Sequence, residues 1–137
     1  RIGEILLREG DRFITPRSFR LMTAMSRVDP LPTTVGEGGE GTFFCRYGFA
    51  LQRLATLRAG CRDDPFGDGV TRIGHSGEAY SLRSGLFVDP DSGTGTVWFI
   101  TELAEVGEPR GARSAFTAAE EALLAEARVA IVPVRRR

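Results

Sequence analysis

The 137-residue sequence contains no lysine, because all eighteen of its basic residues are arginine. It therefore cannot supply a lysine as Schiff base, general base or P-loop phosphate ligand. Asparagine is also absent, and histidine occurs once, at position 75. With one histidine and two cysteines, a four-ligand zinc site is not expected. We expect neither a metal nor an organic cofactor.

An excess of charge of one sign is missing as well. The eighteen arginines are balanced by eighteen acidic residues, so the composition does not favour nucleic acid as a partner. The basic end at residues 135–137 reads as a solvated tail. No apolar run approaches the roughly 20 residues that a membrane helix needs, so we expect no transmembrane segment.

The length fits one domain, but the first residues look like the inside of a helix. Ile2, Ile5 and Leu6 follow helical spacing directly after Arg1. We therefore expect residues 1–137 to be a single partial domain, a piece of a longer polypeptide with no internal boundary. Localisation cannot be read from such a start.

The two cysteines, Cys45 and Cys61, stand 16 positions apart, outside any CxxC spacing. A disulfide at the open end of a hairpin would stabilise the fold by roughly 3 kcal/mol. It would also favour an oxidising compartment, periplasmic or secreted. Two buried free thiols in a cytosolic protein are the alternative, and the spacing leaves both open.

Helix signals lie near both ends of the chain. Apolar spacing predicts a helix over residues 1–9 that ends at Gly10. Thr15-Pro16 predicts the start of a second helix, with Phe19, Met22 and Met25 or Ser26 on one face. The glycine-rich segment 29–41 reads as a surface loop. Thr117-Ala118-Ala119-Glu120 is a capping-box sequence that predicts a helix to about residue 127.

Strand composition fills the middle of the chain. We expect strands within residues 42–57, 70–76, 82–88 and 94–102, a hairpin turn at 89–93, and a short extra strand at 129–134. Since neither face of the central strands is plainly polar, the sheet needs cover on both sides. The expected fold class is α+β, an antiparallel sheet with flanking helices. The acidic loop 59–69 lacks the spacing of an EF-hand, so calcium is a minor alternative there.

The segment Gly74-His75-Ser76-Gly77-Glu78-Ala79-Tyr80 holds the single histidine beside a hydroxyl and a glycine. It is the place where proton transfer and close backbone approach coincide. An ordinary surface or packing histidine is the competing interpretation.

This segment and its surroundings resemble the C-terminal part of the serine β-lactamase (class C) and penicillin-binding-protein-like hydrolases, including D-alanyl-D-alanine carboxypeptidases and related esterases. Gly74-His75-Ser76-Gly77 is similar to the third motif of that family, Lys-Thr-Gly or His-Ser-Gly. Tyr47-Gly48-Phe49-Ala50-Leu51 resembles its Tyr-Gly-x-Gly-Leu strand, and the hairpin and helix that follow continue the pattern. The resemblance implies the C-terminal portion of a β-lactamase/transpeptidase-like fold.

The resemblance also implies roles for individual residues. His75 and Ser76 would be catalytic, facing the cleft from an edge strand. Gly77 would leave room for substrate, and the backbone N–H of Glu78 would be an oxyanion donor, a contact worth roughly 3 to 4 kcal/mol in the transition state. Tyr80 would line the pocket or pack. Substrates would be β-lactams, esters or D-amino-acid peptides.

The acylation machinery of that family is missing here. Its Ser-x-x-Lys and Tyr-x-Asn motifs need lysine and asparagine, which this chain lacks. An upstream segment or a second chain would have to carry the nucleophile. The alternative is a non-catalytic binding or assembly module built on the same sheet. In either case the sheet should expose apolar area and favour association with another chain.

Overall fold

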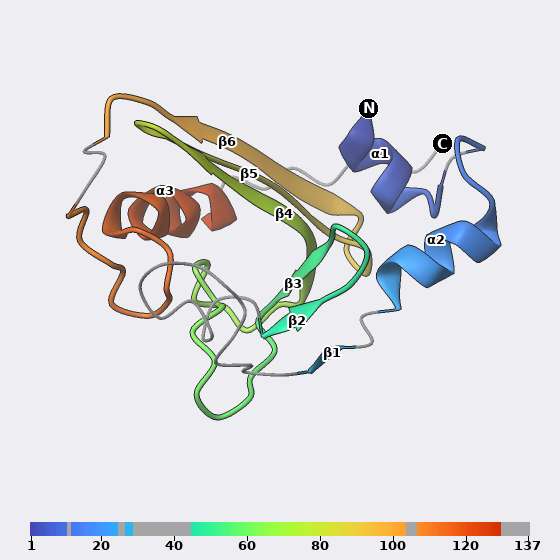
Figure 1. The fold of residues 1–137 in the computed structure, drawn as a ribbon, viewed down its shortest axis with the longest axis horizontal. Coiled ribbons are helices and arrows are strands. Elements are labelled where there is room, and N and C mark those ends of the chain that lie inside the picture. Colours follow the sequence, from blue (N-terminus) through green and yellow to red (C-terminus); the bar gives the residue numbers. More distant parts are fainter. Residues whose placement is uncertain (11, 25–26, 29–44, 104–106, 130–137) are drawn as a thin grey trace.

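The computed structural model describes residues 1–137 except 11, 25–26, 29–44, 104–106 and 130–137. The described part contains one antiparallel sheet, whose six strands follow one another in sequence order, and three helices (Figure 1). The helices are α1 (Ile2–Leu7), α2 (Pro16–Thr23) and α3 (Ala118–Val129). The strands are β1 (Arg27–Val28), β2 (Arg46–Tyr47), β3 (Gln52–Leu54), β4 (Arg72–Ala79), β5 (Leu82–Asp89) and β6 (Thr94–Ile100).

Helices cover both faces of the sheet, as the two-sided apolar pattern of the strands requires. In Figure 1, α1 and α2 lie beyond one side of the sheet and α3 lies against the other. Two separate apolar clusters result. The first joins the sheet to α1 and α2 through Leu6, Phe19, Leu51, Ile73 and Val88. The second lies on the α3 side and contains Leu54, Phe66, Phe87, Trp98, Phe116 and Leu124. The expected α+β class with an antiparallel sheet and flanking helices is therefore confirmed.

Two helix starts follow the predicted side-chain chemistry. Thr15 caps α2, because its hydroxyl accepts the Ser18 N–H at 3.1 Å and Pro16 occupies the first helical position. Thr117 and Glu120 form the reciprocal capping box of α3. Glu120 N–H donates to the Thr117 hydroxyl at 3.2 Å, and Thr117 N–H donates to the Glu120 carboxylate at 3.0 Å. Both predictions are confirmed.

The strand predictions need correction at two places. Residues 48–51 form the turn between β2 and β3, closed by Gly48 N–H donating to the Leu51 carbonyl at 2.8 Å. The Tyr-Gly-x-Gly-Leu match is therefore mostly a turn rather than a strand. Strand β4 runs past the expected end at 76, because the reversal occurs at Tyr80 and Ser81 instead. The loop expected at 29–41 and the strand expected at 129–134 lie almost entirely outside the described residues.

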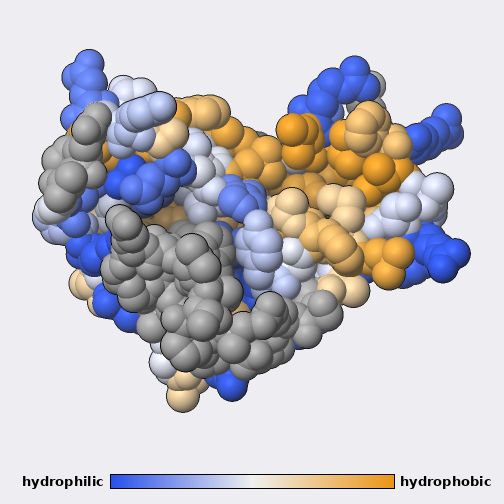
Figure 2. Space-filling view, in the orientation of Figure 1, coloured by the Kyte–Doolittle hydropathy of each residue, from blue (hydrophilic) through white to orange (hydrophobic). Residues whose placement is uncertain are grey.

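Part of the sheet, at β6, remains exposed in the described structure. Val97 and Phe99 on β6 expose 59% and 71% of their area, consistent with the expected apolar exposure. Figure 2 shows apolar side chains gathered over the half of the molecule that holds α1, α2 and the adjoining strands. In the described part of the chain no helix is long and apolar enough to cross a membrane.

Candidate functional site

The candidate site lies on the second half of β4, where only one neighbouring strand is found in the described part of the chain. Strand β3 pairs with β4 at Arg72, Ile73 and Gly74. From His75 to Ala79, β4 pairs with β5 alone among the described residues. The expectation of an edge strand thus holds for this half of β4, whereas its first half is an interior strand. An open edge presents unpaired backbone N–H and C=O groups.

His75 is exposed and is held by a tyrosine from β2. The Tyr47 hydroxyl lies 2.8 Å from His75 Nε2, and the two rings meet edge to face at 5.8 Å. The other ring nitrogen, Nδ1, contacts the carbonyl oxygen of Ser76. Since a carbonyl can only accept, Nδ1 carries a proton. In neutral His75, Nε2 is therefore the acceptor for the Tyr47 hydroxyl.

Ser76 is half-buried and has a different partner. Its hydroxyl donates to Gln52 Oε1 at 3.2 Å, and Gln52 itself is fully buried. Successive residues of a strand point to opposite faces. The side chains of His75 and Ser76 therefore point to opposite faces of the sheet, although the two residues are adjacent in sequence.

The remaining predicted site residues lie further along the same hairpin. Gly77 pairs with Ser84, and a Cβ at this position would come within 2.6 Å of the Ser84 hydroxyl. The Glu78 carboxylate forms a 2.8 Å ion pair with Arg83, so its side chain is directed to β5. Tyr80 is at the tip of the hairpin turn, 88% exposed, with φ at +53°. The structure does not bring Tyr80 together with His75.

Sequence reasoning missed Tyr47 and Gln52 as the partners of His75 and Ser76. Each contact joins residues 24 or more positions apart and depends on the register of β2, β3 and β4. The only signal in the sequence was the position of both residues in the aromatic-rich segment before the acidic loop. Strand order alone would not have identified them.

The two cysteines flank the β2–β3 hairpin and are joined in the structure. Cys45 precedes β2 and Cys61 follows β3, with their Cα atoms 5.9 Å apart and their sulfurs bonded. The bond closes the open end of the hairpin that carries Tyr47 and Gln52. The partners of His75 and Ser76 are thereby fixed to the loop that leads to β4.

The acidic loop before β4 uses its carboxylates internally. Asp68 pairs with Arg72 at 2.8 Å, and this guanidinium lies over the Phe66 ring. The Arg72 hydrogen bond lowers the pKa of Asp68. Burial raises the pKa of Asp63, although the Thr56 N–H opposes the shift. Within the described ranges, no cluster of three or more metal-ligating side chains occurs, here or elsewhere.

Comparisons with known proteins identify no relative. No family model matches the chain, and neither a curated protein nor a solved structure matches it significantly.

Proposed function

We propose that this chain is the C-terminal segment of a serine hydrolase that acts through an acyl-enzyme on β-lactam, ester or D-amino-acid peptide substrates. One observation carries the proposal. The His75-Ser76-Gly77-Glu78 run occupies the part of β4 that, among the described residues, pairs on one side only, where an extended substrate can add to the sheet edge. The resemblance of this run to the third motif of β-lactamase-like hydrolases supplies the reaction class.

The proposal assigns a separate role to each of the four residues along that edge of β4. In the proposal the Ser76 hydroxyl turns from Gln52 Oε1 to a substrate carboxylate or carbonyl, and His75 offers an imidazole for proton transfer. Gly77 adds no side chain between them and the substrate. The Glu78 N–H would be an oxyanion donor, acting with the N–H of the attacking serine.

The nucleophile lies outside this chain in the proposal. The 137 residues contain no lysine, so they hold no Ser-x-x-Lys motif. An upstream segment of the same polypeptide, or a second chain, supplies the serine. The Cys45–Cys61 bond favours a periplasmic or secreted location for the assembled enzyme.

A non-catalytic binding or assembly module is the second candidate. It is favoured by the exposed Val97 and Phe99, which offer a docking surface without requiring chemistry. Reaction of the chain, joined to its upstream segment, with a fluorescent penicillin and a fluorophosphonate distinguishes the two. Covalent labelling supports the hydrolase, and the absence of labelling with both probes supports the module.

A further inference from the structure

Arg46 and Arg53 form a pair of like charges at the open end of the β2–β3 hairpin. The two residues are directly opposite in the antiparallel register. Side chains in such positions share a face, with Cβ atoms roughly 4.5 to 5.5 Å apart, and like charges there are destabilising. The pair therefore carries an electrostatic cost that a bound anion would remove.

Neither guanidinium has an acceptor in the described part of the chain. Four arginines in that part are at least partly buried. Arg72 pairs with Asp68 and Arg83 pairs with Glu78. The guanidinium groups of Arg46 and Arg53 make no hydrogen bond or ion pair there, and Nε of Arg46 is buried without a partner. Arg46 and Arg53 thus differ from the other two partly buried arginines, whose guanidinium groups are paired with carboxylates.

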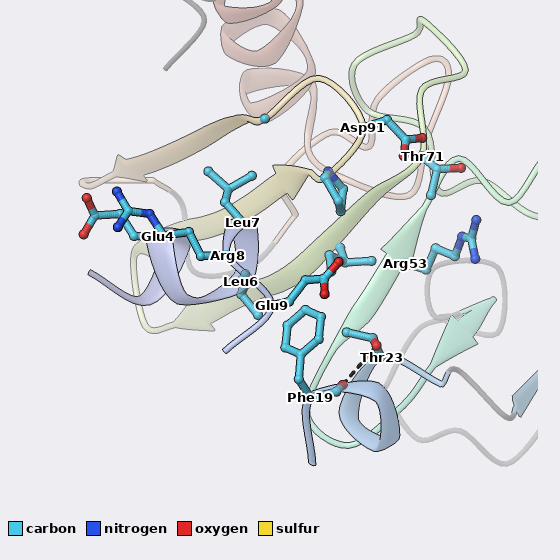
Figure 3. A pocket seen from close by; sticks show the side chains of 13 residues that line it. Glu4, Leu6, Leu7, Arg8, Glu9, Phe19, Thr23, Arg53, Thr71 and Asp91 are labelled. Atoms are coloured by element: carbon cyan, nitrogen blue, oxygen red, sulfur yellow. Dashed lines mark hydrogen bonds between the residues drawn. The ribbon is translucent and has the colours of Figure 1, made fainter. Parts of the chain in front are cut away.

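Arg53 also lines a cavity of about 770 Å³ between the sheet, α1 and α2. Figure 3 shows Arg53 on β3 at one end of it, with Leu6 and Phe19 on the facing helices. The volume is within the range of small-molecule sites, roughly 300 to 1,000 Å³. Ile73, the β4 partner of Arg53, adds to the apolar lining.

We propose that Arg46 and Arg53 bind the carboxylate of a small organic acid whose apolar tail occupies this cavity. A guanidinium binds a carboxylate through paired N–H donors, and two of them side by side fit one anionic head. Glu4, Glu9 and Asp91 also line the cavity, and none of them pairs with Arg53 in the described part. These carboxylates favour a ligand whose negative charge is confined to the end at the arginine pair.

Calorimetric titration of the chain with octanoate, acetate and inorganic phosphate tests this site. Octanoate should bind saturably and at least tenfold more tightly than acetate or phosphate. Arg53→Gln and Arg46→Gln should each weaken octanoate binding at least tenfold. Arg58→Gln, which removes an equal charge from an exposed position, should leave it unchanged. Absence of saturable binding, equal binding of phosphate, or equal loss in the Arg58 variant would overturn the proposal.

Arg53→Glu is the control that distinguishes loss of the binding site from loss of the fold. This variant replaces the like-charge pair by an opposite-charge pair, so its melting temperature without ligand should equal or exceed that of the parent chain. Octanoate should raise the melting temperature of the parent chain and not of the variant. A variant that melts at the parent temperature and is still stabilised by octanoate would contradict the site. The test involves no covalent step, so its outcome is independent of the hydrolase proposal.

Discussion

Tyr47 and His75 are 28 residues apart in sequence, yet the tyrosine hydroxyl lies 2.8 Å from Nε2 of the histidine. This contact joins the β2–β3 hairpin to the half of β4 that holds the candidate site. It also sets the direction of the imidazole, since Nδ1 faces the Ser76 carbonyl. His75 is thus held in one orientation by these two contacts.

Replacing Tyr47 by phenylalanine should release the imidazole while leaving the fold intact. The ¹⁵N chemical shifts of both ring nitrogens of His75 should change, because Nε2 loses its hydrogen-bond partner. Tyr80→Phe is a matched control at the exposed hairpin tip and should leave the shifts unaltered. Identical histidine shifts in the parent and the Tyr47 variant would show that the contact is not formed in solution.

Gly74 should tolerate no side chain. A Cβ there would lie 1.9 Å from the Leu86 carbonyl oxygen and 2.7 Å from Phe87 Cα. Both are backbone atoms of β5, which cannot move away unless the strand itself shifts. We expect Gly74→Ala to lower the free energy of unfolding by about 3 kcal/mol, measured by urea denaturation.

Gly3→Ala is the matched control for that measurement. Its added methyl group meets only the Val88 and Leu86 side chains at 3.8 to 3.9 Å. Because alanine favours helix over glycine, this variant should be neutral or slightly more stable. Equal losses for the two variants would contradict the tight packing of β4 against β5.

The Asp68–Arg72 pair predicts a pH dependence of stability. The pKa of Asp68 is lowered in the folded state by its hydrogen bond to Arg72. The contribution of Asp68 to the free energy of unfolding is therefore fully present above pH 3.8, the ordinary pKa of the group. It is lost as the pH falls through the lower pKa that Asp68 has in the folded state. Asp68→Asn should be less stable by about 1 to 2 kcal/mol at pH 7.

The difference in stability between the parent chain and Asp68→Asn should shrink as the pH is lowered below 3.8, the ordinary pKa of Asp68. Denaturation curves taken at several pH values measure it. Asp91→Asn removes the same charge from an exposed position and should follow the parent curve. A constant gap between parent and Asp68→Asn across this range would show that the pair is not formed.

The disulfide makes a chemical prediction. Ellman titration of the unreduced, denatured chain should find no free thiol, whereas two would exclude the bond between Cys45 and Cys61. Reduction should lower the free energy of unfolding by roughly 3 kcal/mol. The double variant Cys45→Ala/Cys61→Ala should be insensitive to the reductant.

The sequence predicted those parts of the fold that depend on neighbouring residues. Thr15 and Thr117 mark helix starts because each caps amides within three positions. Strand ends were less accurate, since a strand was expected over residues 70–76 while β4 runs to Ala79 and the chain reverses at Tyr80 with a positive φ. That conformation is uncommon for tyrosine and has no local signal.

The candidate site was predictable only in part, for a related reason. The His75 to Glu78 run is a local pattern and was identified from the sequence. Its partners Tyr47 and Gln52, and the opposition of Arg46 to Arg53, depend on strand register. A one-residue slip would turn each side chain to the other face, and composition does not specify the register.

The most direct test of the hydrolase account is the rate of covalent labelling by a fluorescent penicillin and a fluorophosphonate. The protein is this chain joined to the upstream segment that the hydrolase proposal requires, with His75→Ala, Ser76→Ala and the control Arg58→Ala. The account predicts one labelled serine outside residues 1–137, labelling slowed at least tenfold by either substitution on β4, and no change in the control. Absence of labelling with both probes, or labelling at an equal rate in all variants, would contradict it.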